Sequence, residues 1–294
     1  MTLLQPPNIL PKGMFVISRT LREHGKPYDR SRLKGLLQPS TLVLRRTGAN
    51  TFDASFKALR DLGIARLEGD EVTLAADAPD VGDMSTFYRD LVKRVFAGVD
   101  ESNAASTPQS DLLISLAWWC AQDPHGEPLG WENVQPLLFH DMGEAYQSFP
   151  IGNSNPWASF TRWALALGFA ETQSIGDGTS GRVVPDATRA VKSAIQAATF
   201  LEVRADQLLT YLQEQLPVLD GGRLAQYWRP EWNLPPGRRA VVGAVDRVFS
   251  HALLRAEEDG VLALQTLSDA GKITLSDGER DRPVSHVRVL QEVM

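Results

Sequence analysis

Side chains that could bind a nucleic acid gather near the start of the chain. They are cationic, amide or hydroxyl side chains within or just before a predicted helix over residues 51–62: Arg45, Arg46, Asn50, Ser55, Lys57 and Arg60. Arginine and lysine pair with phosphates or guanine edges, and asparagine can pair with adenine. Such a face is typical of a recognition helix that enters the major groove of DNA. The alternative is a solvated helix face on a scaffold domain.

The predicted position of this helix rests on a short sequence motif that recurs along the chain. Residues 59–65 (Leu-Arg-Asp-Leu-Gly-Ile-Ala) return as residues 164–170 and, more loosely, as residues 256–262. Each copy follows an amphipathic stretch, contains a glycine (Gly63, Gly168, Gly260) and continues into alternating apolar and polar residues. A glycine just past the last helical residue ends a helix, so each copy predicts a helix that passes into a β-hairpin. We therefore expect an α+β, mainly α fold of tandem winged-helix units.

The repeat and the composition divide the chain into four segments. We expect a basic winged-helix unit over residues 1–80 and an acidic helical connector with a linker over 81–110. A second winged-helix unit covers 111–199, and a C-terminal helical, winged-helix-like unit covers 200–294. The third helix of the second unit carries large aromatic residues that we expect in its core.

The first unit shows clear signals for helix ends. Pro11 and Gly25 bracket one predicted helix, and Asp29 or Ser31 can cap a second. Asn50 can cap the third helix by accepting an otherwise unpaired backbone N–H. Two short β-branched stretches around residues 68–71 then predict a hairpin.

Charge is distributed unevenly along the chain. The net charge of −6 argues against indiscriminate coating of DNA. Residues 12–66 nevertheless carry a local charge of +8, whereas residues 67–150 carry −12. The first stretch can attract phosphates, and the second suits a basic protein partner. The predicted hairpin tip, Glu68-Gly69-Asp70-Glu71, would repel phosphate and weakens the expectation of ordinary winged-helix docking.

Signatures of catalysis are scarce. The chain has no phosphate-binding Gly-x-x-x-x-Gly-Lys-Ser/Thr run and no Gly-x-Ser-x-Gly elbow. Its single cysteine, Cys120, lies in an apolar run and is expected to be buried. His140-Asp141 resembles the dipeptide of metal phosphohydrolases, but no further ligands lie nearby. We expect no catalytic residue, metal or cofactor; a nuclease site built from distant carboxylates is the remaining enzymatic alternative.

Two further features concern location and an aromatic cluster. No apolar run approaches the ~20 residues of a membrane span, and the first residues lack a secretory signal, so a cytoplasmic protein without membrane contact is expected. Tyr227, Trp228, Arg229 and Trp232 form a proline-framed cluster. It could stack bases or cover a helix bundle.

Several short strings resemble the DpdG family. They are the opening residues 4–11 leading into Phe15-Val16-Ile17, the run 249–254, Ser268-Asp269-Ala270 and the run 283–288. The resemblance implies membership of bacterial gene clusters that insert 7-deazaguanine derivatives into DNA and restrict DNA lacking them. It implies an accessory of the restriction arm that works beside helicases and ATPases. The family supplies no catalytic motif, so no catalytic residue is carried over.

Together these observations predict a non-catalytic adaptor in a DNA-acting defence complex of the restriction type. Its expected partners are double-stranded DNA and an ATPase or helicase subunit. One alternative is a scaffold whose units bind only protein. Another is a dimeric transcriptional regulator, which would bind palindromic half-sites.

Overall fold

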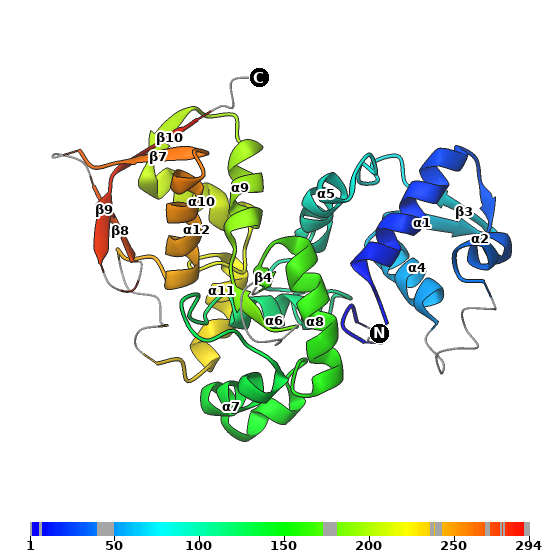
Figure 1. Cartoon of the computed structure of the whole chain (residues 1–294), viewed down its shortest axis with the longest axis horizontal. Helices are drawn as coiled ribbons and strands as arrows, with labels where there is room; N and C mark the ends of the chain where they lie inside the picture. Colours follow the sequence, from blue (N-terminus) through cyan, green and yellow to red (C-terminus); the bar gives the residue numbers. More distant parts are fainter. Residues whose placement is uncertain are drawn as a thin grey trace.

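Helices account for about half of the described chain, and its strands form small antiparallel sheets (Figure 1). The computed structural model describes residues 2–5, 8–39, 50–172, 181–235, 238, 243–267, 271–276, 278 and 280–290. The expected α+β class with mainly helical content is confirmed for these residues.

The first unit follows its predicted helix signals. It contains α1 (Pro11–His24), β1 (Tyr28–Asp29), α2 (Arg30–Leu37), α4 (Thr51–Asp61), β2 (Ala65–Glu68) and β3 (Glu71–Leu74). Pro11 opens α1, and Gly25 ends it in the left-handed conformation. The Asp29 carboxylate accepts a backbone N–H at the start of α2, and the Asn50 side chain accepts one at the start of α4. The predicted caps Asp29 and Asn50 are thus confirmed.

The second unit is built around buried aromatic rings. The helix α5 (Met84–Phe96) of the expected connector precedes it. The unit's elements are α6 (Ser110–Trp119), α7 (Trp131–Met142), the 3-10 helix η1 (Gly143–Ser148), α8 (Ser154–Leu167), β4 (Ala170–Thr172) and β5 (Val183–Pro185). Trp157, Phe160 and Trp163 of α8 are buried, as expected. Asn153 caps α8, because its side chain accepts the backbone N–H of Asn155 at 3.2 Å.

The third unit contains β6 (Glu202–Arg204), α10 (Ala205–Gln215), α11 (Arg223–Trp228), η2 (Arg229–Glu231), α12 (Arg247–Glu258), β7 (Leu262–Gln265), β8 (Ile273–Ser276), β9 (Asp281–Val284) and β10 (His286–Val289). The helix α9 (Thr188–Gln196), at the end of the expected second unit, packs against α12 and α10. Asp246 caps α12 by accepting the N–H of Phe249 at 2.8 Å.

The strands of this third unit do not pair in chain order. β7 pairs with β10 instead of the next strand β8, which places Val287 opposite Leu264, both buried. β8 pairs with β9 in a hairpin of its own.

One pattern of strand pairing recurs in all the units. In the first, β1 precedes the second helix and pairs with the second strand of the hairpin, which gives the order β1-β3-β2. In the third, β6 precedes α10 and pairs with β10 in the order β6-β10-β7. In the second, Leu129 precedes α7 and forms an antiparallel bridge with Val183 of β5, which also pairs with β4.

The three predicted helix ends are confirmed. Gly63, Gly168 and Gly260 have φ values of +67°, +80° and +70° and follow α4, α8 and α12. The residue after each glycine donates its N–H five residues back, as Phe169 does to the Ala164 carbonyl at 2.9 Å. Together with the hydrogen bond from the N–H of the glycine itself, this bond forms a Schellman motif. The motif ends the helix and lets the chain continue as a strand within two residues.

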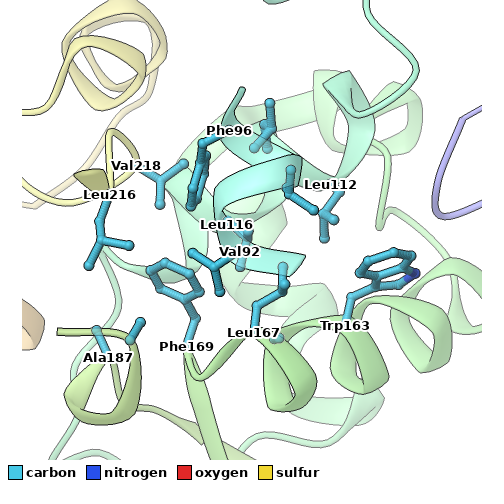
Figure 2. Packing of buried hydrophobic residues seen from close by; sticks show 14 of the residues in the cluster. Val92, Phe96, Leu112, Leu116, Trp163, Leu167, Phe169, Ala187, Leu216 and Val218 are labelled. Carbon is cyan, nitrogen blue, oxygen red and sulfur yellow. The ribbon is translucent and has the colours of Figure 1, made fainter. Parts of the chain in front are cut away.

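The units share one hydrophobic core instead of standing apart. Figure 2 shows Val92 and Phe96 of α5 packed among Leu116 of α6, Phe169 and Leu216. The ring centroids of Phe96 and Phe169 lie 6.1 Å apart, edge to face. The segment expected to be a connector, α5, therefore belongs to the core between units, and it also contacts α1, α8 and α9.

A short N-terminal arm adds a second link between the first and second units. Leu3 and Leu4 are fully buried, and their backbone N–H groups donate to the Asp111 carboxylate at 3.2 and 2.8 Å. Burial raises the pKa of Asp111 despite these hydrogen bonds. The arm thus fixes the start of the chain against α6.

The glycine at the end of α8 should tolerate substitution less well than its counterpart after α12. The left-handed backbone alone costs an alanine about 1–2 kcal/mol at either site. A Cβ at Gly168 would also lie 2.9 Å from the backbone nitrogen of Ala190, whereas a Cβ at Gly260 meets nothing within 4 Å. Thermal unfolding followed by circular dichroism should give a larger drop in midpoint for Gly168→Ala than for Gly260→Ala. Equal drops would contradict the close approach of α9.

Candidate nucleic-acid interface

A polar hollow of about 480 Å³ lies over α4, beside the start of α2. Arg30, Lys57 and Arg60 line it together with Asp53 and Asp61. Position 57 follows position 53 by one helical turn, and position 60 lies three residues further, so these side chains share one face of α4. The hollow therefore brings cations from two helices to one concave surface.

The structure places three of the predicted residues at this hollow. Asn50 is exposed and caps α4. Lys57 is half-buried and forms an ion pair with Asp61 one turn later. Arg60 is exposed and has no ion pair with any residue that the structure describes. Of the two cations, Lys57 is engaged by Asp61, so Arg60 has the charge that is more available to a ligand.

One predicted residue does not belong to this surface. The expectation that Ser55 faces solvent is wrong, because its side chain is fully buried against the start of α1. Its hydroxyl accepts the N–H of Leu10 at 3.2 Å, and a Cβ added at Gly13 would come within 2.9 Å of it. Ser55 therefore supports the packing of α1 on α4. Arg45 and Arg46 lie outside the described residues.

Two cations that the sequence analysis missed reach the hollow's edge from α2. Arg30 and Lys34 bind the two oxygens of Asp53 at 2.7 and 2.6 Å. Burial raises the pKa of Asp53, but the hydrogen bonds from Lys34, Asn50 and Arg30 outweigh it and hold that pKa below its ordinary value. The guanidinium of Arg30 also lies over the ring of Phe56, 5.7 Å from its centroid. The Asp53 carboxylate thus partly neutralises the positive charge of this surface.

The adjacent hairpin tip carries the opposite charge, as the sequence predicts. Glu68 and Asp70 are exposed beside Gly69, which turns the chain at φ +60°. The tip joins β2 to β3 and is therefore part of the same unit as the hollow. Any anionic ligand on α4 has to approach from the side away from this tip.

His140-Asp141 proves to be a structural anchor. The Asp141 side chain is fully buried and accepts bonds from the Trp118 indole at 2.9 Å and from both terminal nitrogens of Arg238 at 2.9 and 2.6 Å. His140 is mostly exposed, with its Nδ1 3.0 Å from the same carboxylate. Both Asp141 oxygens are thus engaged, and they join α7 to Trp118 of α6 and to Arg238.

The aromatic cluster divides into core and surface residues. Trp228 is buried, Tyr227 is exposed, and Trp232 lies between these extremes. Arg229 is buried and pairs with Asp246 at 2.8 Å. The ion pair of Arg229 with Asp246 therefore anchors the cluster on its buried side, and only part of its aromatic surface is exposed to solvent.

The described residues contain no group of three or more His, Cys, Asp or Glu side chains arranged to hold a metal ion. Cys120 is buried, as predicted, and burial raises the pKa of its thiol. Across the same described part of the chain, no helix has the length and apolar character needed to cross a membrane.

The fold and this surface define an α+β protein of repeated helix-and-hairpin units with a polar, cation-lined hollow on the first. The chain belongs to the DpdG-like family, whose sequence model matches residues 1–270. Family membership suggests a role in the Dpd-associated system. No curated protein and no solved structure gives a significant match.

Loss of the Asp141 carboxylate should destabilise the protein strongly. Asp141→Ala leaves Arg238 partly buried without its charge partner, which costs about 3–5 kcal/mol in comparable buried pairs. His140→Ala removes an exposed side chain and should change the unfolding free energy by less than about 0.5 kcal/mol. Urea unfolding of the two variants checks this difference, and similar losses would contradict the anchoring role.

Proposed function

We propose that this chain is a non-catalytic adaptor of tandem winged-helix units that holds DNA through its first unit. The recurring pairing of strands supports the winged-helix assignment. In such units a strand before the second helix pairs with the second strand of the wing, as β1 does with β3 and β6 with β10. The third helix of each unit then precedes the wing, as α4, α8 and α12 do.

The observation that carries the DNA contact is the hollow over α4. α4 holds the place of the recognition helix, and Arg60 and Lys57 point from it toward solvent beside Arg30 of α2. Phosphate contacts from Arg and Lys position a protein on a duplex, and an exposed amide such as that of Asn50 can read a base edge. The first unit therefore has the side chains that both kinds of contact need.

Family membership and the acidic charge of residues 67–150 support a protein partner. Membership of the DpdG-like family supports work within a defence system that acts on DNA carrying or lacking 7-deazaguanine. The acidic stretch 67–150 offers a surface for a basic face of an ATPase or helicase subunit. The chain would then link DNA to the subunit that consumes ATP.

A protein-only scaffold is the second candidate function. The acidic tip at Glu68 and Asp70 and the ion pairs that occupy Arg30 and Lys34 favour it. Retardation of a DNA duplex by the full chain at moderate salt separates the two functions. A retarded DNA band supports the adaptor, and an unshifted band supports the scaffold.

Reversal of charge at Arg60 should weaken DNA binding. We expect Arg60→Glu to lower affinity by about tenfold and to reduce the slope of log affinity against log salt by about one, because one phosphate contact is lost. Arg255→Glu on α12 makes the same charge change on an exposed residue of the third unit and is the matched control. Fluorescence anisotropy across a salt series measures both. An unchanged slope would remove Arg60 from the interface.

Removal of the charge at position 53 should act in the opposite direction. Asp53→Asn keeps the size of the side chain but releases Arg30 and Lys34 from their ion pairs. We expect affinity for duplex DNA to rise by roughly two- to fivefold and the salt slope to steepen. Asp61→Asn, which frees Lys57, is a second test on the same face. A fall in affinity for both variants would show that DNA docks elsewhere.

A further inference from the structure

A second cavity lies far from α4 in the chain, beside α11 and η2, where the second and third units meet. It has a volume of about 400 Å³, within the range of small-ligand sites. Its apolar wall consists of Ala225, Pro230, Trp232 and Leu234. Ligand binding in this cavity does not require DNA contact through the first unit.

The two arginines on the wall are already committed to protein partners. Arg229 donates to Asp246 at 2.8 Å and to the carbonyls of Ala117 and Val218 at 3.2 and 3.3 Å. Arg238 makes the bidentate ion pair with Asp141 described above, with two hydrogen bonds. Because both cations have their counter-charges, the cavity is not built for an anion, and an uncharged ligand fits it better.

Asp220 is an acidic residue of the cavity wall, which also includes the amide side chain of Gln226. Its side chain is 8% exposed, and one oxygen accepts the N–H of Asp246 at 3.0 Å. The other oxygen lies 3.5 Å from Arg229, a long contact. An ionised carboxylate has about four lone-pair positions, so Asp220 can accept further N–H groups from the cavity side.

The surroundings of Asp220 place its titration close to neutrality. Burial first, and then the nearby charge of Asp246, raise its pKa to about 6, while Arg229 and the backbone N–H groups of Asp246 and Gly221 act against them. Above this pH the group accepts N–H donors, and below it the group is protonated.

Trp232 supplies a flat surface of fixed orientation. Its ring packs edge to face on Phe149, with centroids 6.1 Å apart and planes at 85°. This contact holds the indole in one plane at the cavity wall. Indole faces stack well on planar heterocycles, and each such stack contributes about 1–3 kcal/mol in nucleic-acid complexes.

We infer that this cavity binds a nucleobase, stacked on Trp232 and donating N–H groups to the Asp220 carboxylate. A guanine edge, with N1–H beside the N2 amino group, presents two neighbouring donors to one carboxylate. The base comes either from a free nucleoside or from an unpaired position of a strand, and the chemistry at Asp220 and Trp232 is the same for both.

Isothermal titration calorimetry of the full chain with guanosine at pH 7.5 tests the inference. We expect saturable binding at one site, weakened about tenfold or more by Trp232→Ala and by Asp220→Asn. Trp232→Phe keeps a ring against Phe149, so a smaller loss there separates stacking from unfolding. Tyr227→Ala is the matched control, because Tyr227 is an exposed neighbouring ring outside the cavity wall. Its affinity should stay within about twofold of the parent.

Further arms complete the test. Binding of guanosine should weaken as the pH falls through about 6, since the acceptor at Asp220 is then protonated. Much tighter binding of a single-stranded oligonucleotide than of guanosine assigns the base to a strand, and equal binding assigns it to a nucleoside. Absence of binding by guanosine and by the oligonucleotide at millimolar concentration overturns the inference. Loss of binding in Tyr227→Ala, or full binding in both cavity variants, also overturns it.

Discussion

The fold depends on three helices that end in a left-handed glycine. At Gly63, Gly168 and Gly260 the backbone adopts positive φ, and the next residue bonds back to the helix. Only glycine reaches this conformation without the steric cost of a Cβ. Each end leads directly into the first strand after the helix, which pairs with a later strand: β2 with β3, β4 with β5 and β7 with β10. The direction in which each of these three strands starts therefore depends on the backbone angles of one glycine.

Local signals allowed much of the first unit to be predicted from the sequence. Helix caps such as Asp29 and Asn50 act within a few residues of their targets, so their residue types and spacing identify them. The glycine ends are equally local. The pairing of β7 with β10 is not, because it joins residues more than twenty positions apart and competes with the nearer β8. Sequence periodicity shows that a strand exists but not which strand it joins.

The candidate site shows the same division. Periodicity placed Lys57 and Arg60 on one helix face, and the structure brings them to one hollow. It could not show that Ser55 turns toward α1, since a small polar residue is compatible with either face of a helix. Nor could it bring Arg30 and Lys34 to Asp53, because those contacts arise only when α2 packs on α4. Ion pairs between two helices depend on how the helices pack, which the spacing of residues along the sequence does not show.

Contacts of α5 with α1, α8 and α9 have a consequence for the geometry of the whole molecule. The helix α5 contacts α1 of the first unit as well as α8 and α9, and the arm at Leu3 and Leu4 fastens the first unit a second time. Units joined by loose tethers would sample many separations, as beads on a string do. Here the contacts of α5 and of the N-terminal arm hold the first unit against α6 and α8, so the surface on α4 keeps a set position relative to the rest of the core.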